Sequence, residues 1–488
     1  MDKIDWKPDP SSSIPLYQQI EGFMKEKITS GEWTVGMKLP SQRALAAAFQ
    51  VNRSTLIMAL EHLTSQGYIA GKSGGGTTII HHQPERQWES PPPPNWNAYV
   101  EDGVHYPNLP TIQTINRMEF DPTMIRLGTG ELSPELLPQE QVRLLFAELA
   151  RQHMPLGYEE ALGTYALRSQ VSAHLQRVGI SAPPSTILIV SGSLQAFQLI
   201  SAGLLEKGST MLLEKPSYLY SIHAFQSAGM KLIGLPMDES GLQVSHVERF
   251  KRQYDASLLY TIPTFHNPTG TVMSDKRRRD LLETSLRIGL PILEDGAYEE
   301  LWFGHEAPPP PLRALDTQGQ VLYVGTMSKI VSPGLRIGWV VGPQPVIERL
   351  ADIKMQTDYG SSSLSQAAAA EWFGAGWHAE HCRTIRRQLK ERRDCMLQLL
   401  DAHWSNLATW STPQGGFYIW VTLHANISMA ALFEHALKRG ILINPGYIYD
   451  RSAKKQLRLS FAYAGLDEME RAMIELSILI RHIHCLSV

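Results

Sequence analysis

The stretch Gly325–Val341, GTMSKIVSPGLRIGWVV, places a polar loop between two short apolar runs. Such runs are typical of buried strands. The loop carries Thr326, Lys329, a Pro-Gly turn and Arg336. Removal from water favours the neutral, nucleophilic form of a lysine amine, and a hydroxyl with a guanidinium suits a phosphate group. The stretch indicates a site for amine chemistry on a phosphorylated ligand, with an ordinary surface loop as the alternative.

The same stretch resembles the S-x-S-K-x-x-x-P-G-x-R-x-G-W motif of fold-type I enzymes of the aminotransferase class I/II kind, which depend on pyridoxal phosphate. The resemblance implies that Lys329 forms a Schiff base with this cofactor. It also implies that Thr326 and Arg336 hold the cofactor's phosphate. If the resemblance is real, the other cofactor-binding residues of the family should follow in order along the chain.

The N-terminal part carries a different pattern. Apolar residues show helical spacing over 14–29, 42–49 and 53–66. Two short strands are expected at 68–70 and 77–80, on either side of a glycine-rich turn. This order is typical of a winged helix-turn-helix. The segments PLYQQI, LPSQRALAAAF and VNRSTLIMALEHLTSQGYI resemble the N-terminal domain of the GntR regulator family.

In a helix-turn-helix the second helix offers its first residues to the major groove of DNA. The residues expected to contact DNA are Arg43, Arg53, Ser54, Thr55 and, on the wing, Lys72 and Gly75. Arginine pairs with guanine, and hydroxyls reach bases or phosphates. Residues 1–82 contain eight basic and seven acidic side chains, a weak electrostatic footprint. A helical module that no longer binds DNA therefore stays open as the alternative.

Residues 83–119 contain the run PPPP and show no helical or strand period. Proline runs favour extended, semi-rigid spacers. We therefore expect a winged-helix domain at 13–82, a linker at 83–119 whose end already packs on the next domain, and a cofactor domain at 120–488. From residue 120 apolar runs and helical patterns alternate, which predicts an α/β fold with a mainly parallel sheet and a small C-terminal α+β subdomain.

The family's remaining cofactor contacts appear in order on this second part. The resemblance assigns them to Tyr158 (reaching the partner subunit's cofactor), Ser193, Leu194, Tyr218, Asn267, Asp295 and Tyr298. We expect Tyr158 to open a helix over 157–179. The strand–glycine–helix junction at Gly192 suits an anion, because a helix N-terminus presents free N–H groups.

The alternatives to these assignments are structural. Asp295 follows a buried strand and needs a cationic partner, which a protonated pyridine nitrogen supplies, but it could instead cap a helix. Tyr218 matches the aromatic residue over the cofactor ring, and Tyr220 competes for that place. Arg458 matches the arginine that holds a ligand carboxylate by two hydrogen bonds, the alternative being a surface ion pair.

Composition adds exclusions. The chain of 488 residues has 45 basic and 48 acidic side chains, so charge alone points to no partner. The three cysteines have no metal-like spacing, and we expect no metal site. No apolar run is long enough to cross a membrane, and we expect a cytoplasmic protein.

A GntR-type domain followed by an aminotransferase-like domain is similar to the MocR subfamily of bacterial transcriptional regulators. The resemblance implies a homodimer that binds operator DNA and senses a small amino compound, through an external aldimine, or pyridoxal phosphate itself. A working aminotransferase with an appended DNA-binding module is the alternative. The sequence leaves open the effector, the operator and the direction of regulation.

Overall fold

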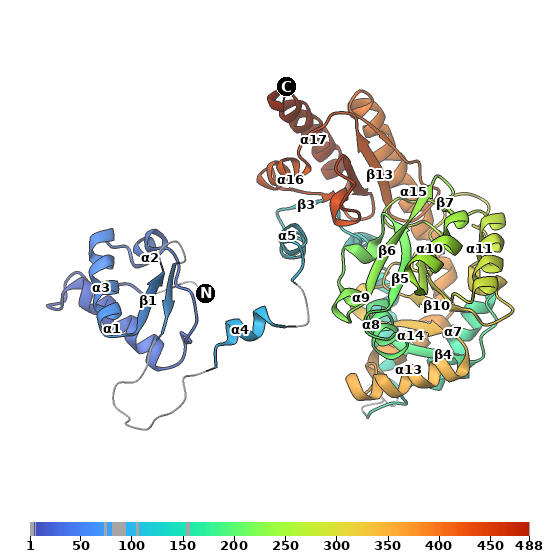
Figure 1. The fold of residues 1–488 in the computed structure, drawn as a ribbon, viewed down its shortest axis with the longest axis horizontal. Coiled ribbons are helices and arrows are strands. Elements are labelled where there is room, and N and C mark those ends of the chain that lie inside the picture. The colour runs from blue at the N-terminus through green and yellow to red at the C-terminus, as the bar shows by residue number, and fades with distance from the viewer. Residues whose placement is uncertain are drawn as a thin grey trace. The chain divides into compact units, whose positions relative to one another are not determined.

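The computed structural model describes residues 4, 6–72, 76–80, 94–103, 107–152 and 157–487. The chain forms two compact units, Met1–Val104 and His105–Val488 (Figure 1). Each unit has a buried apolar core of its own.

The smaller unit is a winged helix-turn-helix, as the sequence predicts. Its elements are α1 Leu16–Thr29, α2 Gln42–Phe49, α3 Arg53–Ser65 and the antiparallel strands β1 Ile69–Lys72 and β2 Gly76–Ile79. The Ser41 side chain caps α2 by accepting a hydrogen bond from the backbone N–H of Ala44. Apolar residues at helical spacing, such as Ile20, Met24 and Leu56, form the core between the helices.

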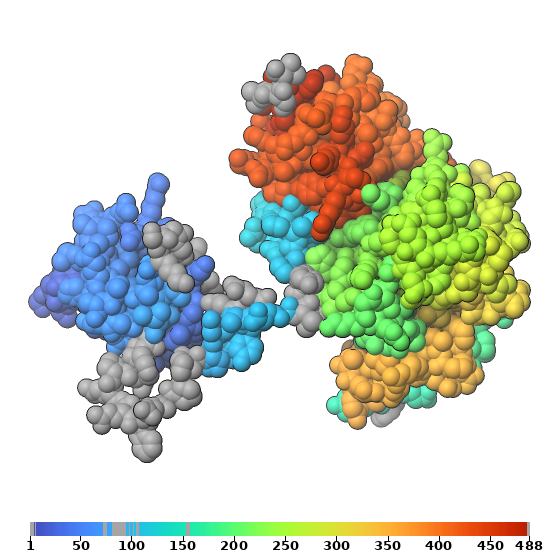
Figure 2. All heavy atoms as spheres, in the orientation of Figure 1, coloured from blue at the N-terminus to red at the C-terminus, as the bar shows by residue number. Residues whose placement is uncertain are grey.

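The stretch predicted as an extended linker, 83–119, contains two helices, α4 Trp96–Glu101 and α5 Pro110–Met118. Helix α5 starts with a proline, which fits the first turn because that turn needs no N–H donor. Ile112 and Ile115 lie one turn apart and are buried in the core of the larger unit. Figures 1 and 2 show α5, in cyan, against the C-terminal part of that unit. One apolar turn among polar residues is too weak a period to predict a helix.

The larger unit is built on an eight-stranded sheet in the order β4-β11-β10-β9-β8-β5-β6-β7. Strand β11 is antiparallel to its neighbours and β7 is antiparallel to β6, while the remaining pairs are parallel. The mainly parallel sheet is therefore confirmed. The strands are β4 Ile187–Val190, β5 Thr210–Lys215, β6 Lys231–Asp238, β7 Gly241–Leu242, β8 Ala256–Thr261, β9 Ile292–Asp295, β10 Val321–Thr326 and β11 Gly338–Val341.

Both faces of this sheet are covered. Successive residues of one strand enter different cores: Met211 and Leu213 pack in one, and Leu212 between them packs in the other. The covering helices include α7 Tyr165–Arg177, α8 Ser193–Gly203, α9 Ala224–Ser227, α10 Val247–Tyr254, α11 Asp275–Ile288, α12 Leu312–Leu315, α13 Gln344–Thr357 and α14 Ser363–Gly374.

The helix predicted over residues 157–179 begins later than expected. Helix α7 starts at Tyr165, because the Thr164 side chain caps it by accepting a hydrogen bond from Leu167 N–H. Tyr158 therefore precedes the helix and does not open it. Tyr165 is exposed, whereas Leu167 and Val171 are buried.

A second, four-stranded sheet has the order β12-β13-β16-β15 and forms the predicted C-terminal α+β part. Its strands and the separate parallel pair are β12 Ala408–Trp410, β13 Tyr418–Leu423, β15 Asn444–Pro445 and β16 Gln456–Ser460, with β14 Ile441–Leu442 beside β3 Ile125–Arg126. The remaining helices are α6 Gln139–Leu149, α15 Trp377–Trp404, α16 Met429–Lys438 and α17 Leu466–Ser487.

Candidate functional site

One cavity of about 350 Å³ collects nearly all the residues that the sequence assigns to the cofactor and its ligand. Every one of them lines the cavity except Tyr158. The lining residues from that set are Ser193, Leu194, Tyr218, Asn267, Asp295, Tyr298, Thr326, Lys329, Arg336 and Arg458. They come from both sheets and from loops spread over the whole larger unit.

Three of these residues follow neighbouring strands of the large sheet. Asp295 ends β9, Lys329 follows β10 and Asn267 follows β8, and β9 lies between the other two. Because these strands are parallel, their carboxyl ends meet at one edge of the sheet. This is the edge where open α/β folds bind ligands.

Lys329 is partly buried, and its Nζ donates a hydrogen bond to the carbonyl oxygen of Gly130 at 2.6 Å. A neighbouring polar turn supports this position: Thr326 Oγ1 lies 3.0 Å from Ser328 Oγ and accepts from Ser328 N–H at 3.1 Å. The lysine is thus held over the segment 128–131, with its amine facing the cavity.

Asp295 is buried and accepts hydrogen bonds from Tyr260 Oη at 2.8 Å and from Ala297 N–H at 3.1 Å. Burial raises the pKa of this carboxyl, against the opposing effects of the Tyr260 hydrogen bond and the charge of Lys329. A buried carboxylate of this kind is stabilised by a cation. The alternative, in which Asp295 caps a helix, does not apply, because the described residues 296–311 contain no α-helix.

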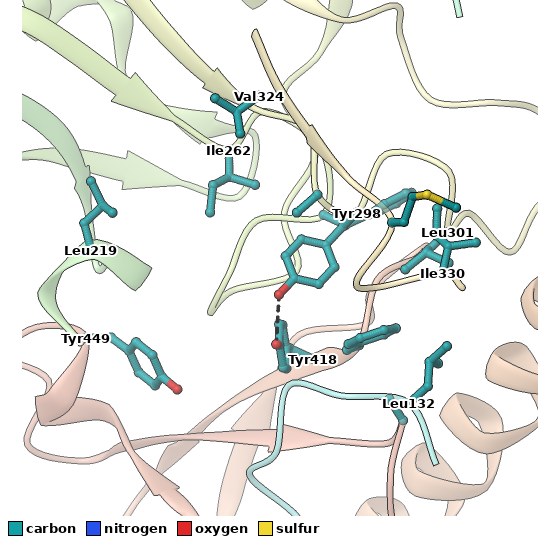
Figure 3. Close-up of a cluster of buried hydrophobic side chains, with 14 of the residues drawn as sticks. Leu132, Leu219, Ile262, Tyr298, Leu301, Val324, Ile330, Tyr418 and Tyr449 are labelled. Atoms are coloured by element: carbon teal, nitrogen blue, oxygen red, sulfur yellow. Dashed lines mark hydrogen bonds between the residues drawn. The ribbon is translucent and has the colours of Figure 1, made fainter. Parts of the chain in front are cut away.

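Asn267 and Arg458 form one buried hydrogen-bonded group with two tyrosines. Arg458 Nη1 donates to Asn267 Oδ1 at 2.7 Å, and Asn267 Nδ2 donates to Tyr298 Oη at 3.4 Å. The hydroxyls of Tyr298 and Tyr418 lie 2.9 Å apart (Figure 3). Arg458 is only 4% exposed and its Nε has no hydrogen-bond partner among the described residues. Arg458 is therefore no surface ion-pair residue, and its unpaired donor fits a ligand anion.

Helix α8 directs its N-terminus at the cavity through Gly192, Ser193 and Leu194. No side chain caps this end, so its N–H groups are open to an anion. Arg336 Nη2 donates to the Ser191 carbonyl at 3.0 Å and lies beside Gly192. An uncapped helix start beside a guanidinium suits the cofactor's phosphate.

The close approach of Arg336 depends on Gly192. A Cβ added there would lie 2.5 Å from Arg336 Nη2, and Gly192 has φ +83°. We expect Gly192→Ala to lower affinity for pyridoxal phosphate roughly tenfold, the equivalent of ~1.4 kcal/mol. Titration of apo-protein followed by visible absorbance measures it. Gly208→Ala is the control, because Gly208 has φ +93° but open space around it. If the Gly192→Ala and Gly208→Ala proteins bound pyridoxal phosphate with equal affinity, the phosphate site at Gly192 and Arg336 would be contradicted.

Tyr218 lines the cavity, and burial together with Asp295 raises the pKa of its hydroxyl. Tyr220 does not line it, so Tyr218 holds the position expected of the aromatic residue. Tyr158 lies elsewhere: it is 84% exposed and contacts Tyr359, with ring centroids 4.9 Å apart. Tyr158 is not among the described residues that line the cavity of its own chain.

The cavity also has residues that the sequence reasoning missed: Glu119, Glu131, Tyr418, Asn444 and Tyr449. The sequence around these residues only partly indicated a role at the site. Tyr418 and Tyr449 stand in apolar stretches around the second sheet, where a tyrosine is typical of the core. Arg458 lies between these two rings, 4.0 Å and 4.8 Å from their centroids.

A second buried polar cluster lies outside this cavity. His174, Glu300 and His378 place their side-chain donor atoms within 4.8 Å of one another. Trp372 Nε1–H donates to His378 Nδ1 at 3.2 Å, so His378 Nε2 carries the proton and donates to Glu300 at 3.0 Å. A protonated nitrogen has no lone pair for a metal. Burial lowers the pKa of His174 to about 4, so that ring is neutral near pH 7. The arrangement satisfies a buried carboxylate.

On the smaller unit, the residues expected at DNA cluster at two helix starts. Arg43 lies on α2, and Arg53, Ser54 and Thr55 open α3. Both arginines and Ser54 are exposed, and Thr55 is half-buried. Arg53 Nη2 donates to Gln42 Oε1 at 3.3 Å, which joins the two helices. Lys72 ends strand β1, and Gly75 lies outside the described residues.

Comparison with known proteins agrees with this geometry. Residues 122–476 match the family of class I and II aminotransferases, and residues 16–79 match the gntR family of bacterial regulatory proteins. The chain therefore belongs to the GntR-type regulators that carry an aminotransferase domain. Within that class it belongs to the MocR subfamily of transcriptional regulators. The aminotransferase domain implies pyridoxal phosphate as its cofactor.

Individual relatives have the same layout. The chain is 53% identical, over 95% of its length and 96% of the relative's, to the uncharacterized HTH-type transcriptional regulator YisV of Bacillus subtilis. It is 32% identical, over 90% and 98%, to the HTH-type transcriptional regulator NorG of Staphylococcus aureus. Its structure matches the kynurenine aminotransferase of Pyrococcus horikoshii with a TM-score of 0.73 and 31% identity, over 78% of this chain and 96% of that one. No helix in the described part of the chain could span a membrane.

Proposed function

We propose that the chain is a cytoplasmic regulator that binds operator DNA and changes its DNA affinity when a small amino compound enters the cavity of the larger unit. The observation that carries this proposal is the single cavity in which the predicted cofactor residues meet, on a chain whose other unit is a GntR-type reader. Pyridoxal phosphate, when bound, supplies an aldehyde that reacts reversibly with amines.

Each cavity residue that the sequence assigns to the cofactor or its ligand has a role in this proposal. Lys329 holds the aldehyde carbon, and Asp295 pairs with the protonated ring nitrogen. Tyr218 stacks on the ring, where an aromatic contact adds to the gain from burial. Arg458 holds the carboxylate of the amino compound by two hydrogen bonds. Asn267 and Tyr298 contact the ring's 3′-oxygen, and the phosphate is held by Ser193, Leu194, Thr326 and Arg336.

The proposal includes a homodimer, to which Tyr158 contributes. The Tyr158 side chain is 84% exposed, which is unusual for a large aromatic residue. Tyr165, nearby in the sequence, and Tyr359, whose ring contacts Tyr158, are exposed as well. A second copy that covers these rings would bring Tyr158 to the phosphate of its partner's cofactor. Two winged helices in one dimer would also contact two DNA half-sites.

Helix α5 offers a physical route from the cavity to the DNA reader. Ile112, Ile115 and Asn116 of α5 line the cavity, and α5 forms the C-terminal end of the stretch predicted as the linker. Thr111 of the same helix lies 2.9 Å, hydroxyl to hydroxyl, from Tyr447. A ligand that contacts α5 can therefore favour one placement of the linker over another. Regulation needs only a difference in ligand affinity between two such states.

The amine-sensing step is tested with full-length protein loaded with pyridoxal phosphate and freed of unbound cofactor. A panel of amino compounds is screened for a change in visible absorbance, and each active compound is then added to retardation assays with the DNA upstream of the chain's own gene. We expect the same compound to change both. A compound that changes the spectrum without changing DNA affinity, across the whole panel, contradicts the proposal; an effect of pyridoxal phosphate alone would identify the cofactor as the signal.

At the DNA end, we expect Arg53→Ala to lower affinity for that DNA by roughly tenfold or more, because one arginine-to-base contact contributes about 1–3 kcal/mol. Fluorescence anisotropy at fixed salt measures the change. Arg279→Ala, an exposed arginine on α11 of the larger unit, serves as the matched control. Unchanged affinity of the Arg53→Ala protein would remove α3 as the reading helix.

A working aminotransferase is the second candidate, because both Lys329 and Arg458 are present in the cavity and the matched solved structure is an aminotransferase. Repeated turnover of an amino donor with a 2-oxo acid, beyond one equivalent per chain, would favour it.

A further inference from the structure

The cavity has more acidic groups than the proposed function uses. The acidic and basic side chains that line it are Glu119, Glu131, Asp295, Lys329, Arg336 and Arg458. The three bases are taken by the cofactor's aldehyde, its phosphate and the effector's carboxylate, and Asp295 is taken by the ring nitrogen. Glu119 and Glu131 are left without a partner on the cofactor or on the amino-acid head of the effector.

Glu131 lies next to the reacting amine. It directly follows Gly130, whose carbonyl oxygen accepts the hydrogen bond of Lys329 Nζ. Its half-buried carboxyl makes no hydrogen bond or ion pair with any described residue. Burial raises the pKa of Glu131, the charges of Lys329 and Arg126 oppose this rise, and the charge of Glu119 adds to it. A cation in direct contact would stabilise this carboxylate.

Glu119 approaches from the other side of the same segment. It follows α5 directly, and its Oε1 accepts a hydrogen bond from Thr129 Oγ1 at 3.0 Å. Thr129 stands between Gly128, whose carbonyl accepts from Arg458, and Gly130, whose carbonyl accepts from Lys329. The two glutamates are thus carried near the carboxylate-binding and amine-binding positions.

An independent acceptor lines the same cavity. Asn444 is 5% exposed, and its Nδ2 donates to Tyr449 Oη at 2.9 Å. Its Oδ1 is buried without a hydrogen-bond donor among the described residues. This oxygen lies against Gly128, and because buried acceptors are nearly always paired, a ligand N–H would supply the missing donor. The side-chain oxygens of Glu119, Glu131 and Asn444 are all acceptors for N–H donors.

We infer that the effector is a basic amino acid, whose side chain carries a second cationic nitrogen that pairs with Glu131 and Glu119. The inference rests on the proposed function, because it takes Arg458 as the carboxylate partner. A second carboxylate on the effector would face these two glutamates with no free base in the lining, so acidic amino acids are disfavoured. Pairing with Glu119 would also tie the effector to the end of α5 and hence to the linker.

The test compares L-lysine and L-ornithine with L-norleucine, which is lysine without the distal amine, and with L-glutamate. Cofactor-loaded full-length protein is titrated with each, and the change in visible absorbance gives the half-saturating concentration. We expect lysine or ornithine to act at a concentration roughly tenfold or more below that of norleucine, because a charge-assisted hydrogen bond is lost in the comparison.

Glu131→Gln and Glu119→Gln should remove this preference by weakening lysine or ornithine while leaving norleucine nearly unchanged. Glu283→Gln, at an exposed site on α11, is the matched control and should keep the preference. Equal potency of lysine, ornithine and norleucine, or a preference that survives both glutamate substitutions, overturns the inference. If no amine changes the spectrum, the amine-sensing function fails as well; if norleucine acts as well as lysine, only the cationic subsite fails.

Discussion

Substitution of Lys329 by Ala is expected to abolish the visible absorbance that the wild-type chain acquires with pyridoxal phosphate, and with it every response to amino compounds. Lys329 is the lysine of the cavity lining, and its amine is already held facing the site by Gly130. An alanine leaves no nucleophile at this position. Binding of the smaller unit to DNA should persist, because Lys329 belongs to the other unit.

Spectra and DNA retardation of the Lys329→Ala protein are compared with those of Lys276→Ala, an exposed lysine on α11 that should behave as wild type. If the Lys329→Ala protein kept its visible absorbance, the lysine assignment would be wrong. If it lost DNA binding while staying folded, cofactor binding and DNA binding would be coupled more tightly than proposed.

The second large effect is expected on stability, from Arg278→Met. Arg278 is fully buried on α11, and burial lowers the pKa of its guanidinium. Its nitrogens donate to the carbonyls of Met273, Pro310 and Pro263 and to Thr264 Oγ1, at 2.8–3.1 Å. These acceptors frame the turn that carries Asn267. Methionine fills similar volume but removes the guanidinium donors from all four acceptors, and among them Pro263 O still accepts from the backbone N–H of Met273.

We expect Arg278→Met to lower the free energy of unfolding of the larger unit by about 3–5 kcal/mol. Denaturant unfolding of cofactor-loaded protein measures the change, followed through the cofactor signal because two units need not unfold together. Arg279→Met, at the next position, loses only an exposed ion pair with Asp275 and should unfold like wild type. Equal stability of the two variants would mean that the buried guanidinium does not hold the turn.

The predicted cofactor residues of the cavity could be found from the sequence because they stand where strands end. Lys329, Asp295 and Asn267 follow buried apolar runs, and adjacency of β8, β9 and β10 brings them together. Local pattern could not reveal contacts made between distant segments. Glu131 and Glu119 reach the cavity only because Gly128 and Gly130 pass close to Arg458 and Lys329. The start of α7 was missed because the Thr164 cap, not the helical period, decides it.

The position of α5 has a consequence for regulation. This short helix buries Ile112 and Ile115 in the larger unit and contributes Asn116 to the cavity lining. If the linker ended before the cavity, ligand binding could affect it only through structural changes in other parts of the larger unit. Helix α5, at the C-terminal end of the predicted linker, lines the cavity itself, so under the proposed function a ligand can act on the linker through direct contacts.

The most direct test of the account is to reduce cofactor-loaded protein with borohydride and locate the phosphopyridoxyl group by peptide mass spectrometry. Reduction turns a carbon–nitrogen double bond to a lysine into a stable single bond. The account predicts the added mass on Lys329 and on no other lysine. A modification on another lysine, or none on a protein that still binds its operator, would contradict it.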